Sequence, residues 1–178
     1  MLLTRDNLPN TISDTAALDD LLCRPSQALI DDLEKVDGDI MILGVAGKMG
    51  PTLAGLAKAA LPGRRVIGVA RFSDPAAKTW LEARGIESIG CDLLDESAIK
   101  ALPKVKNIIF MAGRKFGAEG DLALTWAMNA HVPALVAQAF RESRIVAFST
   151  GCVYPFVPVD GGGANEATAP DPPGERFR

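Results

Sequence analysis

The sequence predicts an α/β fold: a doubly wound parallel sheet with strand order 3-2-1-4-5, preceded by an N-terminal helical arm. Three observations lead to this prediction. Short apolar segments rich in β-branched residues alternate along the chain with segments rich in Ala, Leu and Lys. The apolar segments are nearly continuous, which is typical of strands buried on both faces of a sheet. Strict alternation of strand and helix predicts right-handed crossovers, and therefore parallel strands.

The apolar segments give the expected strands, and the segments between them give the expected helices. We expect strands at residues 40–44, 66–70, 86–91, 107–112 and 145–149. We expect helices at residues 51–61, 75–84, 96–102 and 121–142. The sheet domain is thus expected to span residues 39–154, and the Pro- and Gly-rich segment 155–178, which has no periodicity, is expected to be loop.

Residues 1–38 form the expected arm. Ser13 can cap a first helix that runs to Leu22, and Pro25-Ser26 can open a second helix that stops at Asp37-Gly38. The apolar residues of the second helix recur at helical spacing. We therefore expect the arm to pack on the helices of the sheet or on a second copy in a homodimer.

Composition excludes several classes of function. The chain has 178 residues, a net charge of −3 and a pI near 5.2, which argues against nucleic acid as a partner. Its apolar runs are too short for a membrane span, so no membrane is expected. Three cysteines without ligand spacing and a single histidine predict no metal site. Cysteines without a disulfide framework favour reduced thiols and the cytoplasm.

A glycine turn joins the first expected strand to the first expected helix. Gly44, Gly47 and Gly50 enclose Lys48 and Met49, and a helix follows at once. In a Rossmann sheet such glycines allow the sharp turn, the close approach of a pyrophosphate and the packing of helix on strand. The helix N-terminus adds N–H groups and a positive dipole end. The context predicts NAD(P) binding, although a purely structural turn remains the alternative.

The residues after the second strand predict which dinucleotide is bound. Arg71 stands where a carboxylate would bind the ribose of NAD and where an arginine accommodates the 2′-phosphate of NADP. Ser73 can add a hydroxyl donor, and Lys48 a second positive charge. NADP is therefore preferred over NAD. The alternative is a solvated Arg71, with Asp74 capping the next helix or binding the ribose.

Two aspartates follow the third strand. Asp95 is the natural N-cap of the next helix, which leaves Asp92 available for the adenine edge of the cofactor. An Asp92 that accepts hydrogen bonds from its own loop is the alternative.

Several blocks together resemble the extended short-chain dehydrogenase/reductases, the NAD(P)-dependent epimerase/dehydratase family. These blocks are GVAGKMG at 44–50, Asp92, FMAG at 110–113, Asn129, FSTGCVYPF at 148–156 and NEATAP at 165–170. Their order along one chain carries the resemblance, which covers residues 40–175. It implies the N-terminal nucleotide-binding half of such an enzyme, with 155–178 leading toward a substrate domain.

The resemblance also implies roles for individual residues. Thr150, with Ser149 beside it, corresponds to the family hydroxyl that binds the substrate oxygen, and a hydroxyl at this strand end suits that chemistry. A Ser-Thr pair that binds its own backbone is the alternative. Asn129 corresponds to the family asparagine that steadies the active site, and Ala112 and Gly113 would line the nicotinamide ribose.

The implied function is hydride transfer on a hydroxy or keto substrate, such as a nucleotide sugar, by an NAD(P)-binding oxidoreductase or epimerase. The family's Tyr-x-x-x-Lys pair is missing, because Tyr154 is the only tyrosine and Pro158 stands four residues later. This chain alone is therefore expected to be inactive. A non-catalytic, NADP-sensing regulatory protein of the same fold is the alternative.

Overall fold

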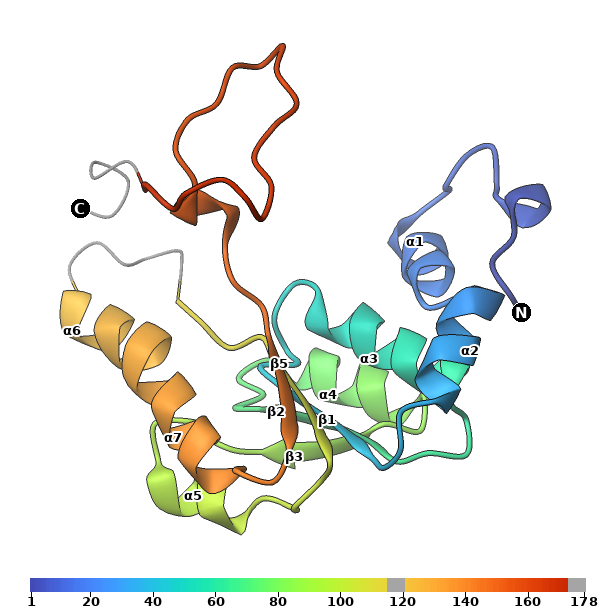
Figure 1. Cartoon of the computed structure of the whole chain (residues 1–178). Helices are drawn as coiled ribbons and strands as arrows, with labels where there is room; N and C mark the ends of the chain where they lie inside the picture. Colours follow the sequence, from blue (N-terminus) through green and yellow to red (C-terminus); the bar gives the residue numbers. More distant parts are fainter. Residues whose placement is uncertain (115–120, 173–178) are drawn as a thin grey trace. The chain divides into compact units, whose positions relative to one another are not determined.

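The computed structural model describes residues 1–114 and 121–172 of the chain (Figure 1). The chain divides into two units, Met1–Ala147 and Phe148–Arg178, each held together by its own contacts. Within the described residues, no helix is long and apolar enough to cross a membrane.

The first unit contains a five-stranded parallel sheet with the order β3-β2-β1-β4-β5, which confirms the predicted doubly wound fold. Apart from β2, the predicted strands extend one or two residues too far at the carboxyl edge, where the chain turns out of the sheet; the third is also predicted to start one residue early and the fifth one residue late. The strands are β1 (Ile40–Leu43), β2 (Val66–Ala70), β3 (Glu87–Gly90), β4 (Asn107–Phe110) and β5 (Arg144–Ala147).

Helices cover both faces of this sheet, with α3 and α4 on one face and α5 and α7 on the other (Figure 1). They are α3 (Gly50–Ala60), α4 (Pro75–Glu82), α5 (Glu96–Ala101), α6 (Leu122–Trp126) and α7 (Val132–Ala139). The helix predicted over 121–142 is confirmed as an unbroken helical stretch over 122–139, in which the π-helical turn Ala127–His131 lies between α6 and α7. Pro133, in the first turn of α7, has no N–H to donate to the preceding turn, and a wider turn accommodates it.

The buried side chains form two clusters, one on each face of the sheet. Alternate residues of one strand point to opposite faces, and β1 follows this rule closely. Met41 and Leu43 belong to the first cluster, which α5 and α7 cover. Ile40 and Ile42 belong to the second cluster, together with Ala54, Ala57, Ala60 and Leu81 from α3 and α4. β1 therefore contributes side chains to both clusters, one on each face of the sheet.

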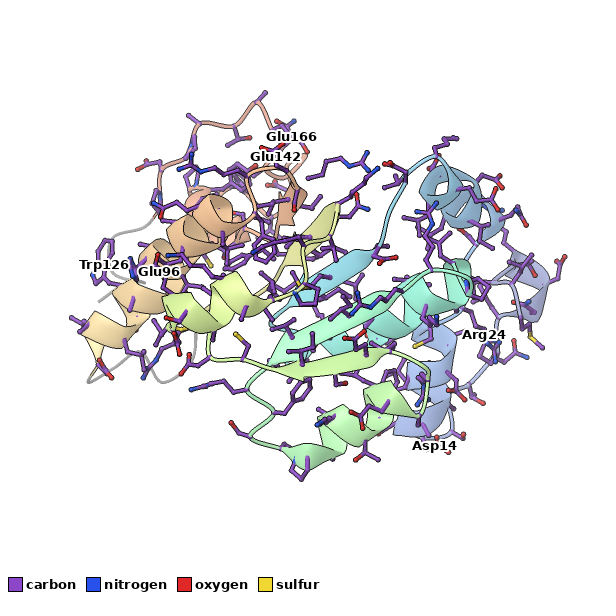
Figure 2. All side chains as sticks on the ribbon, turned by 90° about the horizontal axis from the view of Figure 1, so that it is seen from below. Asp14, Arg24, Glu96, Trp126, Glu142 and Glu166 are labelled. Carbon is purple, nitrogen blue, oxygen red and sulfur yellow. The ribbon has the colours of Figure 1, made fainter. Side chains whose placement is uncertain are left out.

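The N-terminal arm consists of the short 3-10 helix η1 (Arg5–Asn7), α1 (Thr15–Leu22) and α2 (Gln27–Glu34). The N-cap of α1 is Asp14 (Figure 2), whose carboxylate accepts a hydrogen bond from Ala17 N at 2.8 Å. The prediction that Ser13 caps this helix is wrong, because the Ser13 hydroxyl donates to Asp14 instead. Ser26 caps α2 as expected and accepts from Leu29 N at 3.2 Å.

The arm packs on α3 and α4. Leu29, Ile30 and Leu33 of α2 contact the second cluster. Asp20 of α1 forms an ion pair with Arg84 at 3.1 Å, and the Arg84 guanidinium lies 3.7 Å from the centre of the Trp80 ring. The arm therefore adds a further layer to one face of the first unit.

A charged network closes the amino edge of the sheet, just before β1, β4 and β5. The Asp37 carboxylate pairs with both Lys106 and Arg144. The buried Asn107 amide donates to Asp37 O at 2.8 Å and to Asp39 O at 3.1 Å. The two cations, Lys106 first, lower the pKa of Asp37 to about 2.

This network predicts a pH dependence of stability. Because folding lowers the pKa of Asp37, its ionised carboxylate stabilises the native state above the pKa of the unfolded chain, about 4. That stabilisation is lost as the pH falls through the folded pKa of about 2. Asp37→Asn should therefore lower the free energy of unfolding at pH 7, and its difference from the wild type should shrink below about pH 4.

Urea denaturation between pH 2 and pH 7 measures this difference. Asp32→Asn is a suitable control, because Asp32 makes a single exposed ion pair with Lys35. A difference between Asp37→Asn and the wild type that stays constant across the whole range would contradict the role assigned to the network.

The second unit carries little regular structure in its described residues. Its one helical turn is η3 (Gly151–Val153), and turns follow it. Asp171 N donates to Val153 O at 3.0 Å, which joins the far part of the loop to the end of this helical turn.

Candidate functional site

Four predicted site segments follow strands of the first unit and meet at the carboxyl edge of the sheet. They are the glycine turn after β1, Arg71–Ser73 after β2, Cys91–Asp92 after β3, and Met111–Arg114 after β4. Ligands of open α/β sheets bind at this edge, near the point where the strand order reverses. In this chain β1 and β4 flank that point.

The glycine turn can form only with glycine at its two ends. Gly44 has a φ of +88°, and a Cβ there would lie 2.7 Å from Ala112 N, at the end of β4. A Cβ on Gly50 would lie 2.1 Å from Val45 O. The two roles predicted for these glycines, a sharp turn and close helix–strand packing, are both present in the structure.

The contact at Gly50 leads to a prediction of stability. Gly50→Ala should lower the free energy of unfolding by about 1–3 kcal/mol, because the added methyl group meets a backbone carbonyl that cannot move away cheaply. Alanine's higher helix propensity, about 1 kcal/mol, acts in the opposite direction and is the smaller effect. Denaturant titration of the variant checks this.

The matched control for that experiment is Gly63→Ala. A Cβ on Gly63 meets nothing within 4 Å. If Gly50→Ala proves as stable as this control, the close contact between α3 and the end of β1 does not constrain the turn.

The middle of the glycine turn is open to solvent. Residues 46–49 are exposed, between buried Val45 and buried Gly50. Met49 is the N-cap of α3 and provides no side-chain hydrogen bond to the helix. Gly50 N donates to Gly47 O at 3.2 Å, and Pro51 has no N–H. The N–H groups that α3 can offer to an anion therefore begin at Thr52 and have no side-chain cap. A Cβ on Gly47 would meet only Gly44 O, at 3.3 Å.

Three positively charged or polar side chains lie near this turn without a partner among the described residues. Lys48, Arg71 and Ser73 are all exposed, and within residues 1–114 and 121–172 none of them has a side-chain hydrogen bond or an ion pair. Asp74 is the N-cap of α4 and accepts from Ala76 N at 2.9 Å. Asp74 therefore caps the next helix, which was one of the two alternatives for this residue. The Arg71 side chain remains available to a ligand.

The two aspartates after β3 both bind backbone. Asp95 caps α5 as predicted, accepting from Ser97 N at 2.8 Å and Ala98 N at 3.1 Å. Asp92 is exposed and accepts from Leu94 N at 3.0 Å. The loop role weighed as an alternative for Asp92 is therefore present, and contact with adenine stays a prediction.

Asn129 fixes the backbone that follows β4. Its Oδ1 accepts from Arg114 N at 2.7 Å, and its Nδ2 donates to Arg114 O at 2.9 Å. A Cβ on Gly113 would lie 3.3 Å from the same Oδ1, so the residue before Arg114 must be small. Asn129 lies in the π-helix Ala127–His131, and π-helical turns are frequent at functional sites. Asn129 thus positions Ala112–Arg114 beside the glycine turn.

Ser149 and Thr150 belong to the second unit. Both are exposed, and Ser149 lies beyond β5 rather than at the end of the strand as predicted. Thr150 Oγ1 accepts from Cys152 N at 3.2 Å and caps η3. This is the backbone role weighed as an alternative, and it leaves the hydroxyl proton available for donation. The structure therefore brings together the predicted cofactor residues and Asn129, and it places the two hydroxyl residues in the other unit.

Two residues that shape the site were not predicted. Gly68 lies inside β2, and a Cβ there would be 2.9 Å from Val45 Cγ1, directly under the glycine turn. A glycine inside a strand often marks a place where another part of the chain packs closely on the strand, so Gly68 could have been identified from the sequence. Phe72 has a φ of +50°. No sequence signal marks it, because a bulky residue is not expected in that conformation.

Among the described residues, no group of three or more His, Cys, Asp or Glu side chains could hold a metal ion. The site therefore consists of backbone N–H groups, exposed cations and small residues. That donor set suits a phosphate-bearing ligand.

Comparison with known proteins agrees with this fold. A family model described as the NAD dependent epimerase/dehydratase family matches residues 40–177. Among curated proteins, no sequence matches the chain.

Solved structures share the fold at low sequence identity. UDP-glucuronic acid 4-epimerase from Bacillus cereus, in complex with UDP-glucuronic acid and NAD, is 20% identical with a TM-score of 0.62, over 78% of this chain and 48% of that one. ADP-L-glycero-D-manno-heptose-6-epimerase from Helicobacter pylori is 18% identical with a TM-score of 0.62, over 76% of this chain and 46% of that one. The enzyme WbmG from Bordetella bronchiseptica, in complex with NAD and UDP, is 19% identical with a TM-score of 0.60, over 76% and 44%. The chain thus spans less than half the length of these structures.

Proposed function

Because this chain belongs to the NAD-dependent epimerase/dehydratase family, we propose that it binds a nicotinamide dinucleotide, preferentially NADP, along the carboxyl edge of its sheet. The observation that carries this proposal is the glycine turn Gly44–Gly50, whose exposed middle leads into the uncapped N-terminus of α3. The turn, the end of β2 and the end of β4 all lie at one edge of the sheet, where such ligands bind.

The pyrophosphate would be held by backbone rather than by side chains. Gly47 presents no side chain, and the N–H groups at the start of α3 carry the positive end of the helix dipole. Lys48 is exposed in the same turn and adds a positive charge. Met49, also exposed, would lie beside the bound phosphates.

The preference for NADP is supported by the charges at the end of β2. The Arg71 guanidinium and the Ser73 hydroxyl have no partner in the described part of the chain, and together they suit a 2′-phosphate. Asp74, the nearest carboxylate, is engaged at the N-terminus of α4. NAD is the alternative cofactor, because the B. cereus epimerase and WbmG structures both contain NAD.

The remaining site residues would hold the two ends of the cofactor. Asp92, whose carboxylate is exposed, would meet the adenine edge. Ala112 and Gly113, held in place by Asn129, would line the nicotinamide ribose. Asn129 acts in this proposal as a positioning residue, through the backbone of Arg114.

The proposed chemistry is hydride transfer on a hydroxyl or keto group of a small substrate, with the nicotinamide supplying the hydride chemistry when it is bound. A nucleotide sugar is the proposed substrate, since two of the similar structures contain UDP or a UDP-sugar. The Thr150 hydroxyl, with Ser149 beside it, would donate a hydrogen bond to the substrate oxygen. Its lone pair already accepts from Cys152 N, which would orient the hydroxyl proton away from η3.

The cysteines support a reducing compartment such as the cytoplasm for this activity. Among the described residues, Cys23, Cys91 and Cys152 form no disulfide. Burial raises the pKa of Cys23 and that of Cys91, which keeps both thiols protonated and unreactive.

A second candidate function is cofactor sensing without turnover. It needs only the first unit, which contains all the proposed cofactor residues, whereas Ser149 and Thr150 belong to the second unit. In this case NADP would bind at the same edge and no substrate would be converted.

Calorimetric titration with NADPH and with NADH tests the proposal. We expect one saturable site per chain and tighter binding of NADPH. Because this chain alone is expected to be inactive, the enzyme and the sensor are distinguished by incubating the intact gene product with UDP-glucose and UDP-glucuronic acid and separating the sugar nucleotides: the enzyme converts one of them, and the sensor converts neither. Binding of neither dinucleotide at millimolar concentration would refute both candidate functions.

A further inference from the structure

The turn between β2 and α4 holds an unfavourable backbone conformation at Phe72. Among the described residues, Phe72 is the one non-glycine residue with a positive φ, +50°. Such a conformation is disfavoured for a bulky side chain and costs little for glycine or asparagine. A phenylalanine at this position therefore has to be held there by other contacts.

The Phe72 ring provides such contacts. Phe72 is half-buried and packs against the second cluster, between the sheet and the α3–α4 layer. Its burial offsets the backbone cost. The left-handed conformation and the half-buried ring thus occur together: this backbone conformation allows the ring to pack against the second cluster.

Both ends of the turn are fixed. Ala70, the last residue of β2, is buried, and its carbonyl accepts from Cys91 N at 3.0 Å. At the other end Asp74 caps α4, and Pro75 forms its first turn. Only the three residues Arg71–Ser73 lie between these anchors, and Phe72 is the middle one.

The residues on either side of Phe72 face solvent, whereas the Phe72 ring packs against the second cluster. Arg71 and Ser73 are exposed, and in the ranges that the structure describes neither side chain has a hydrogen bond or an ion pair. Their positions thus depend on the backbone of the turn, and that backbone is held by Phe72.

We propose that Phe72 is a positioning residue for cofactor selectivity: its half-buried ring anchors the turn on the second cluster, and the anchored turn presents Arg71 and Ser73 together to a 2′-phosphate. This inference rests on the proposed NADP site. It differs from a structural role, in which Phe72 would only fill the core and would affect both cofactors equally.

Dissociation constants for NADPH and NADH of Phe72 variants test this role. Phe72→Asn tolerates the positive φ and loses the buried ring, whereas Phe72→Leu keeps an apolar anchor. We expect Phe72→Asn to weaken NADPH binding by about five- to tenfold and NADH binding by less than about twofold, since only the contact with the phosphate is lost. Phe72→Leu should restore most of the preference. An equal loss for both cofactors would overturn the proposal.

A double-mutant cycle shows whether Phe72 acts through Arg71. In an Arg71→Ala background, Phe72→Asn should cause a much smaller loss of NADPH affinity than in the wild type, because Arg71, one of the two side chains that it positions, is gone and only Ser73 remains. Additive losses would contradict the proposal. Should Phe72→Asn unfold, Phe72→Gly, which removes the ring and accepts the same φ, carries the same expectations.

The same series separates the two proposals. If the wild type binds neither cofactor, the proposed function fails and this inference fails with it. If the wild type prefers NADPH and Phe72→Asn keeps that preference, the proposed function stands and Phe72 has only a structural role.

Discussion

Gly47→Val is expected to lower the affinity for NADPH and for NADH alike by at least about a hundredfold, or about 2.8 kcal/mol. The side chain would occupy the space over the exposed turn where the pyrophosphate approaches the backbone. Hydrogen bonds from backbone N–H groups to a charged group contribute about 1.5–3 kcal/mol, so the loss of one or two accounts for this effect. Calorimetric titration measures it.

The stability of the free variant is measured by denaturant titration beside the binding, because the new side chain also makes a close contact within the turn. The only neighbour of a Cβ at Gly47 is Gly44 O, at 3.3 Å, and Gly47 does not have a positive φ. Gly63→Val, in the loop that leads from α3 to β2, is the matched control and should bind both cofactors as the wild type does. Unchanged binding by Gly47→Val would place the pyrophosphate elsewhere.

Arg71→Asp is expected to lower NADPH affinity by about tenfold or more and to leave NADH affinity little changed, since a charge-assisted contact contributes about 1.5–3 kcal/mol. The substitution also sets a carboxylate against the 2′-phosphate, which adds repulsion. Dissociation constants for both cofactors, measured at low and moderate salt, check the result, because an exposed charge is screened by salt.

A matched control for this charge reversal is Arg141→Asp. Arg141 is exposed and lies between α7 and β5, at the amino edge of the sheet. It should leave the ratio of the two affinities unchanged. A similar loss of NADPH affinity in both variants would show that net charge, rather than the position of Arg71, sets the preference.

The sheet could be predicted because its signals are local and redundant. Buried parallel strands such as β1 and β2 are continuous apolar runs, and their alternation with helices leaves few topologies. Gly44 and Gly50 were assigned correctly, because a turn from strand to helix needs glycine at these positions. The helix over 121–142 could be predicted, whereas its π-helical middle turn could not, because Pro133 shows only that a normal helical hydrogen bond is absent there.

Side-chain partners were harder to predict because they depend on competition between neighbours. Ser13 and Asp14 are both good N-caps, and only the local geometry selects Asp14. Asn129 was identified by resemblance, whereas its two hydrogen bonds to Arg114 depend on a π-helical turn that no local pattern indicates. Phe72 adopts a positive φ that phenylalanine disfavours, and its packing against the second cluster is a tertiary contact that the local sequence does not indicate.

The central claim is that a phosphorylated dinucleotide lies along the carboxyl edge of the sheet, with its pyrophosphate at Gly44–Gly50 and its 2′-phosphate at Arg71–Ser73. The most direct test is to titrate the isotope-labelled chain with NADPH and then with NADH, and to record the chemical shifts of its backbone amides. The account predicts that both cofactors shift the amides of Gly47 and Gly50, and that the shifts unique to NADPH lie at Arg71–Ser73. NADPH-specific shifts confined to the N-terminal arm or to β5, with the glycine turn unaffected, would contradict it.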